Sequence, residues 1–208
     1  KSICFFQEEA WIAGSEGIRV IRNPLYYKNG ATQDVFLPPV FSSKPTNKVI
    51  ADQSGVVWIA SDGEGVYKFK YTKEKPGYDI ANFKTNFSKN KSLVDDIVNE
   101  LLIDLNNILW IGTSNGISQY PNRNFFVKSF NYIEDQNQVL SNNVVWSILE
   151  DKKGDIWVGT RQGLTQYNQQ NAKHTTYFTN SNSGINGNIL SLLEDRTGRL
   201  WIGTGKEL

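Results

Sequence analysis

The sequence has very few residues of the types that hold metals or form disulfides. Its 208 residues include one cysteine, Cys4, one histidine, His174, and no methionine. A single cysteine excludes an internal disulfide and a multi-cysteine metal site. No Cys, Asp or Glu cluster is spaced to share a metal with His174. We therefore expect neither a bound metal nor a cofactor.

The chain also lacks long apolar runs and an excess of charge of either sign. No stretch approaches the about 18 consecutive apolar residues that a membrane-spanning helix needs, so we expect no direct membrane insertion. Lys and Arg number 22 against 21 for Asp and Glu, and positive charge is nowhere concentrated. A nucleic acid is therefore not expected as a partner. Because the sequence starts at Lys1 and contains no Met, we expect it to be a piece of a longer polypeptide.

Tryptophan recurs at near-regular intervals of 47, 52, 47 and 44 residues. The five tryptophans, each inside a phrase similar to L-W-I-G-T, are Trp11, Trp58, Trp110, Trp157 and Trp201. A period of this length with strand-like content predicts an all-β fold, a β-propeller in which each repeat is a four-stranded antiparallel blade. We expect the five indoles to pack between blades and to hold them together.

A turn motif precedes each of the last four of these tryptophans. The residues six positions before the indoles are Asp52, Asp104, Asp151 and Asp195. Three positions before the indole stands Gly, or Asn107 in the third repeat, which predicts a type I turn with a left-handed exit between two strands. Because the four carboxylates occupy the same turn in different blades, we interpret them as structural and not as catalytic or calcium-binding groups.

The repeats divide the chain into blades. We predict blades at about 1–44, 45–90, 91–138 and 139–183, and an incomplete fifth at 184–208 that stops after its second strand. The fourth strands are expected at 34–37, 78–83, 126–130 and 175–178. About four and a half blades would leave terminal faces uncovered. We therefore expect a fragment of a larger propeller, with seven blades as one option, while a homodimer that seals the gap is the alternative.

Three segments share the pattern D-x-x-G/N-x-x-W-I/V-G-T. They are L-L-I-D-L-N-N-I-L-W-I-G-T-S-N-G-I-S-Q-Y (101–120), S-I-L-E-D-K-K-G-D-I-W-V-G-T-R-Q-G-L-T-Q-Y (147–167) and S-L-L-E-D-R-T-G-R-L-W-I-G-T (191–204). With these phrases the chain resembles the two-component regulator propeller repeat. The first repeat departs from the pattern, with Q-E-E-A in place of the turn, and the second has W-I-A-S-D-G-E-G.

The resemblance implies a place in the periplasmic sensor region of a hybrid two-component system of gut Bacteroidetes-like bacteria. Proteins with this repeat join propellers to an immunoglobulin-like domain, a membrane helix, a histidine kinase and a receiver. They typically detect glycan breakdown products and control transcription through a phosphorelay. Partners would then be the remaining blades and downstream domains of the same protein. The kinase machinery is not in this chain, so we do not expect it to be an enzyme.

A ligand site is expected at the face where the loops between second and third strands meet the segments that lead into each blade. Our candidates for contacts with an oligosaccharide are Glu64, Asn115, Asn143, Trp146 and Arg161. Amides and mixed charges suit a hydroxyl-rich ligand, and Arg161 could pair with a uronate or sulfate. Trp146, in the first strand of its blade, could stack on a sugar or pack in the core. Other polar residues of these loops are Glu16, Asp62, Ser114, Gln162, Asn142, Asn186 and Asn188.

Three classes of function remain open on these observations. The first is a non-catalytic sensor that binds an oligosaccharide or supports the domain that does. The second is a structural or protein-interaction propeller. The third is a propeller glycosidase or lyase, which would use rim acids such as Asp62 or Glu64. The sequence has no G-x-S-x-G motif, and His174 falls in an outer strand, so covalent hydrolysis is the least supported.

Overall fold

The computed structural model describes residues 2–6, 8–22, 44–72, 77–86, 92–121, 128–130, 139–178, 185 and 187–205. These residues form strands β1 to β17 and no helix. The strands group into five sheets in which all recorded pairings are antiparallel. The prediction of an all-β fold is confirmed.

Each sheet is made of strands that follow one another in sequence. The first sheet contains β1 (Ser2–Phe6), β2 (Glu9–Gly14) and β3 (Gly17–Arg22). The second contains β4 (Thr46–Ala51), β5 (Val56–Ser61), β6 (Val66–Thr72) and β7 (Gly77–Phe83). The third contains β8 (Val98–Ile103), β9 (Ile108–Thr113), β10 (Gly116–Pro121) and β11 (Lys128–Phe130).

The last two sheets differ in completeness. The fourth contains β12 (Val145–Glu150), β13 (Asp155–Thr160), β14 (Gly163–Asn168) and β15 (Lys173–Phe178). The fifth contains only β16 (Ile189–Glu194) and β17 (Leu200–Thr204). Every sheet lies inside one of the ranges predicted for the blades. Segment 34–37, the expected fourth strand of the first blade, lies outside the described residues.

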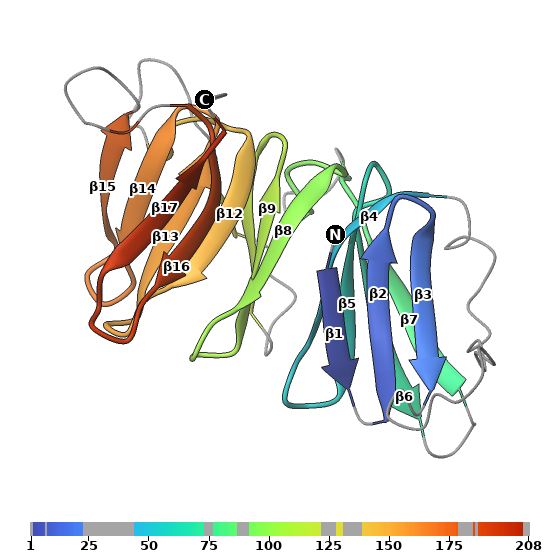
Figure 1. Cartoon of the computed structure of the whole chain (residues 1–208). Helices are drawn as coiled ribbons and strands as arrows, with labels where there is room; N and C mark the ends of the chain where they lie inside the picture. Colours follow the sequence, from blue (N-terminus) through green and yellow to red (C-terminus); the bar gives the residue numbers. More distant parts are fainter. Residues whose placement is uncertain are drawn as a thin grey trace. The chain divides into compact units, whose positions relative to one another are not determined.

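Internal contacts divide the chain into two compact units, residues 1–84 with 96–101 and residues 85–95 with 102–208. In the first unit, β1 and β2 pack against β4, so that the first two sheets lie face to face (Figure 1). Their shared core is built around Trp11, Val57, Ile59 and Phe69. All six residues of β5 are buried, as expected for a strand covered on both faces.

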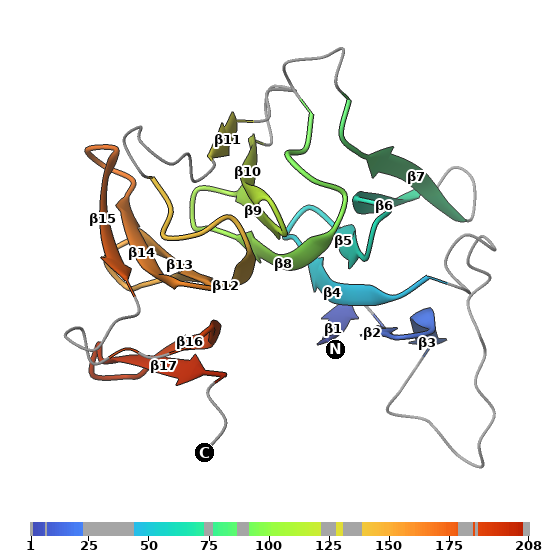
Figure 2. The same cartoon turned by 90° about the horizontal axis from the view of Figure 1, so that it is seen from above.

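In the second unit, β12 packs against β9 on one side and against β16 on the other. Figure 2 shows the fifth sheet lying alongside β12 and β13. The core between the third and fourth sheets contains Trp110, Ile117, Val145 and Val158. Successive repeats of this unit therefore stack through their sheet faces, which is how blades pack.

The turn between first and second strands is the same in four repeats. Its fourth residue has a positive φ at Gly55 (85°), Asn107 (61°), Gly154 (80°) and Gly198 (84°). The aspartate that opens the turn also accepts a hydrogen bond from the indole six residues later. The Oδ2 to Nε1 distances are 3.2 Å for Asp52 and Trp58, 2.8 Å for Asp104 and Trp110, 2.8 Å for Asp151 and Trp157, and 3.0 Å for Asp195 and Trp201. Each carboxylate thus joins the hairpin turn to the indole.

The five indoles differ in burial. Trp11, Trp58 and Trp110 are between 0% and 3% exposed, and Trp157 is half-buried. Trp201 is 57% exposed, in contrast to the packing between blades expected for all five. Trp11 and Trp110 each meet an aromatic ring of the next repeat, Phe69 and Tyr167, and among the described residues no repeat follows the fifth sheet.

Candidate functional site

Three of the five candidate residues lie along one edge of the second unit. Asn115 is in the β9–β10 turn, Asn143 is in the segment that leads into β12, and Arg161 is in the β13–β14 turn. Two backbone hydrogen bonds tie these loops together, from Gly116 N to Asn143 O at 2.7 Å and from Arg161 N to Val144 O at 3.0 Å. The structure therefore joins loops of consecutive repeats into a continuous rim.

Threonines fix the shape of the two turns. The Thr113 hydroxyl donates to Gly116 O at 2.8 Å and accepts from Asn115 N at 3.1 Å. Thr160 makes the equivalent pair of bonds in the β13–β14 turn, and both threonines are fully buried. Because these backbone groups are engaged within the turns, a ligand at the rim would meet side chains such as Asn115 and Arg161, both of which are exposed.

Trp146 lies at a β-bulge in the first strand of the fourth sheet. The pairing of β12 with β13 shifts between Val145 and Ser147, so Trp146 is the extra residue. A bulge re-aims the side chain of its extra residue away from the regular alternation. Leu190 occupies the equivalent bulge in β16. Their exposed fractions are 36% for Trp146 and 48% for Leu190, so apolar surface at this end of the strands meets solvent.

Glu64 lies in the first unit, in the β5–β6 turn, and its carboxylate is already paired. Lys44 and Lys84 both donate to it, one to each oxygen. The hydrogen bond from Lys44 is the largest cause that lowers the pKa of Glu64, and the hydrogen bond from Lys84 is the next largest. Its backbone N–H donates to Ser61 Oγ at 3.0 Å. A carboxylate held by two ammonium groups is a poor general base. This geometry therefore does not favour the hypothesis of a glycosidase or lyase that uses Glu64 in catalysis.

Glu150 is a second carboxylate of interest, which the sequence analysis did not predict. Glu150, the last residue of β12, accepts a hydrogen bond from Leu105 N in the preceding repeat at 2.8 Å through Oε2, while its buried Oε1 has no partner among the described residues. Burial raises the pKa of Glu150, and the neighbouring carboxylates of Asp104 and Asp151 raise it further. Glu194 makes the same contact one repeat later, to Lys152 N at 2.8 Å. These glutamates connect consecutive repeats; the signal in the sequence is the shared L-E-D at 149–151 and 193–195.

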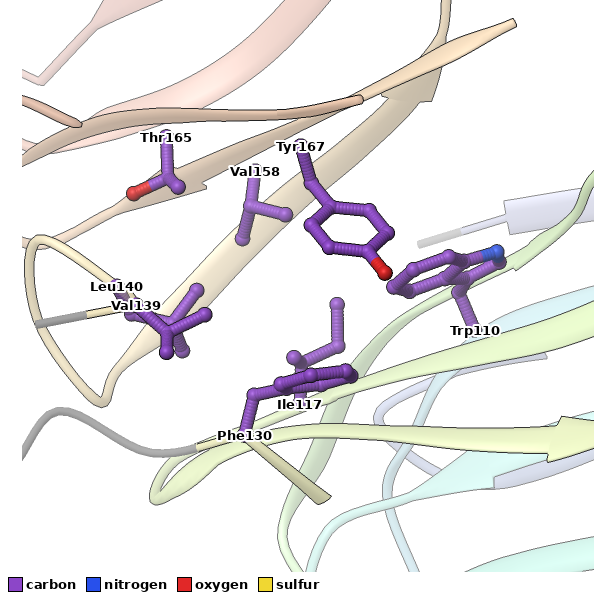
Figure 3. Close-up of a pocket in the computed structure, with 8 residues that line it drawn as sticks. All are labelled: Trp110, Ile117, Phe130, Val139, Leu140, Val158, Thr165 and Tyr167. Atoms are coloured by element: carbon purple, nitrogen blue, oxygen red, sulfur yellow. The ribbon is translucent and has the colours of Figure 1, made fainter. Parts of the chain in front are cut away.

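A small cavity lies inside the core of the second unit, between the third and fourth sheets (Figure 3). Its volume is about 10 Å³, which is about the space of one water molecule. The residues that line it are Trp110, Ile117, Phe130, Val139, Leu140, Val158, Thr165 and Tyr167. A cavity this small and apolar cannot hold a sugar, so we assign it to the packing of the core.

Within the part of the chain that the structure describes, no group of three or more His, Cys, Asp or Glu side chains is arranged to hold a metal ion. The same residues contain no helix long and apolar enough to span a membrane. His174 lies in β15, the outer strand of the fourth sheet, where it pairs in register with Tyr167.

Residues 139–162 and 183–206 match the family model of the two component regulator propeller. Both segments are similar to the two-component regulator propeller repeat. The first covers the lead-in to β12 and the β12–β13 hairpin, and the second covers the fifth sheet. The comparison with curated proteins found no match to the chain.

Several solved structures share the fold of the chain. The chain is similar to the extracellular domain of BT4673 from B. thetaiotaomicron, assigned to a hybrid two component system, with 18% identity and a TM-score of 0.73 over 98% of the chain. PorZ, a surface component of the type-IX secretion system of Porphyromonas gingivalis, has 22% identity and a TM-score of 0.73 over 98% of the chain. Virginiamycin B lyase from Staphylococcus aureus has 11% identity and a TM-score of 0.63 over 97%.

These likenesses show that the chain folds as part of a β-propeller, as predicted. The chain spans 26% of the BT4673 domain, 30% of PorZ and 61% of the lyase. The described strands form one sheet of three strands, three sheets of four strands and one sheet of two strands. The similarity to these larger proteins concerns the fold alone.

Proposed function

We propose that the chain is part of a non-catalytic, extracytoplasmic sensor propeller of a hybrid two-component signalling protein. The observation that carries the proposal is the match of two segments to the two component regulator propeller. The likeness to the extracellular domain of BT4673, assigned to a hybrid two component system, supports it. Signal transduction would run through a phosphorelay in downstream domains to transcription, and the location would be periplasmic.

We infer that the ligand is an oligosaccharide bound at the rim of the second unit. The rim carries the exposed side chains of Asn115 and Arg161, and it carries Trp146 at the adjacent bulge. Amide groups and a guanidinium can hydrogen-bond hydroxyl and acidic groups of a sugar, and an exposed indole can stack on its apolar face. Glu64 is not included in this site, because its carboxylate is paired with Lys44 and Lys84.

Calorimetry of the chain and of the intact extracellular region against neutral and acidic oligosaccharides tests this proposal. Replacing Arg161 by Gln should weaken binding of an acidic oligosaccharide by about 10- to 100-fold, because a charge-assisted hydrogen bond is lost. Arg196 is the matched control, since it is exposed in the β16–β17 turn at the opposite end of the strands. Arg196→Gln should leave binding unchanged.

The alternative outcome is a structural or protein-interaction propeller. Absence of binding to every oligosaccharide in both proteins would reject direct sensing by this region and favour that alternative. Equal losses in the Arg161 and Arg196 variants would show that binding depends on charge in general and not on the rim.

A further inference from the structure

The β9–β10 turn contains an Asn–Gly pair, Asn115–Gly116, at the rim of the second unit. In such a pair the backbone nitrogen of the glycine can attack the side-chain carbonyl carbon of the asparagine, because glycine has no side chain that hinders the approach. Asn115 is exposed, so water reaches its amide group. The two other Asn–Gly pairs of the sequence, Asn29–Gly30 and Asn186–Gly187, lie wholly or partly outside the described residues.

The nitrogen that would attack is held by the next repeat. Gly116 is buried, and its N–H donates to Asn143 O, in the segment that leads into β12, at 2.7 Å. This bond must break before the nitrogen can lose its proton and approach Asn115, so attack requires a local opening. An equivalent bond exists one repeat earlier, from Gly65 N to Asp96 O at 2.9 Å. The bond is therefore a recurrent feature of the junction between repeats at the rim.

We propose that Asn115 is a site of spontaneous deamidation and that the hydrogen bond between repeats controls its rate. When the junction opens, Gly116 N loses its proton and bonds to Asn115 Cγ. The bond from Cγ to the side-chain nitrogen breaks, and ammonia leaves with the proton. Water then opens the five-membered succinimide at either carbonyl, which leaves an aspartate or an isoaspartate at position 115. The net reaction consumes one water molecule, releases one ammonia molecule and changes no oxidation state.

The product carries a carboxylate on the rim in place of an amide. The reaction lowers the formal net charge of +1 by one unit. Under the proposed function, on which this consequence rests, the new negative charge weakens the binding of an acidic oligosaccharide to the rim that also carries Arg161. The rate of deamidation itself does not depend on a sugar. It is measured without one, so its failure is distinguishable from failure of the sensing proposal.

Peptide mapping by mass spectrometry during incubation of the 208-residue chain at mildly alkaline pH tests the proposal. The reference is a synthetic peptide of residues 111–120, which has the same Asn–Gly pair without the junction. Conversion at Asn115 should be measurable in the chain and at least about 10-fold slower than in the peptide, since an opening free energy of about 1.4 kcal/mol lowers the reactive fraction tenfold. Equal rates in chain and peptide contradict the proposal.

Two variants separate the effect of this bond from general protection by the fold. Asn142 Oδ1 accepts from Val144 N at 2.9 Å, and Asn142 Nδ2 donates to Gln162 Oε1 at 3.2 Å. Asn142→Ala removes both bonds and loosens the segment that carries Asn143 O, so conversion of Asn115 should rise by about 3- to 10-fold. Gln162→Ala is the matched control, because it removes only the exposed side-chain bond and should leave the rate within about twofold of the wild type. The same rate in both variants overturns the proposal.

Hydrogen exchange of the Gly116 amide gives a readout that does not depend on the folding of these variants. In the wild-type chain, urea below the unfolding transition should raise the exchange rate of Gly116 and the conversion rate of Asn115 in the same proportion, because both require the same opening. Asn115→Gln is the chemical control, since attack would have to form a six-membered ring, and position 115 should stay unmodified. Conversion that does not follow the exchange rate, or that persists in Asn115→Gln, shows another route and contradicts the proposal.

Discussion

The hydrogen bond between the turn aspartate and the indole should stabilise the repeats far more where the indole is buried. Asp104 is 4% exposed, and its carboxylate accepts from Trp110 Nε1 and from Ile108 N, both at 2.8 Å. Asp104→Ala leaves two donors without this acceptor, and one of them is on an indole that is itself buried. At about 1–3 kcal/mol for each buried unsatisfied donor, the free energy of unfolding should fall by about 2–6 kcal/mol.

Asp195→Ala is the matched control for this prediction. Its carboxylate accepts the equivalent bonds from Trp201 Nε1 and Arg199 N, and further bonds from Thr197 and from Arg199 Nε, but Trp201 is exposed and water can replace the lost acceptor. Urea unfolding followed by fluorescence and circular dichroism measures both variants. The Asp104 variant should lose clearly more stability than the Asp195 variant. Equal losses, or a loss below about 1 kcal/mol for Asp104→Ala, would refute the reasoning.

Two further predictions concern contacts between and within repeats. Burial raises the pKa of Glu150, so the stability that this group gives is complete at low pH and is lost as the pH rises through its folded-state pKa. Glu150→Gln keeps an oxygen that can accept from Leu105 N and removes the charge. In urea titrations the variant should be more stable than the wild-type protein at pH 7, and its stability should change less between pH 4 and pH 7. A pH dependence equal to that of the wild type argues against this account. Thr160→Val removes a buried hydroxyl that lies 2.7 Å from Ser141 Oγ and shapes the β13–β14 turn, so unfolding should become easier by about 1–3 kcal/mol, and Thr160→Ser, which keeps the hydroxyl, should recover most of the loss.

The repeating architecture could be predicted from the sequence because it depends on local patterns. The spacing of the tryptophans gave the number of sheets, and the Asp and Gly positions gave the hairpin turns with their left-handed residue at Gly55 or Asn107. The bond from the indole to the aspartate six residues earlier was not predicted. It depends on the register of the hairpin, which brings the two side chains together on one face.

The candidate site was harder to predict because its properties come from residues distant in sequence. Glu64 looked like an available rim acid, but Lys44 and Lys84 each lie 20 residues away and reach it only in the folded sheet. Trp201 looked equivalent to the other indoles, but it is 57% exposed, whereas Trp110 meets the ring of Tyr167 from the next repeat. Asn115, Asn143 and Arg161 could be placed at one rim, because turns at the same end of antiparallel strands follow from topology; whether they bind a ligand remains a prediction.

A crystal structure of the full extracellular region tests the central claim most directly. The account predicts that the repeats radiate around one axis as blades, with each indole of Trp11, Trp58, Trp110, Trp157 and Trp201 packed against the repeat that follows. A structure in which the five sheets form a single sandwich, or in which these indoles face solvent in the complete protein, would contradict it.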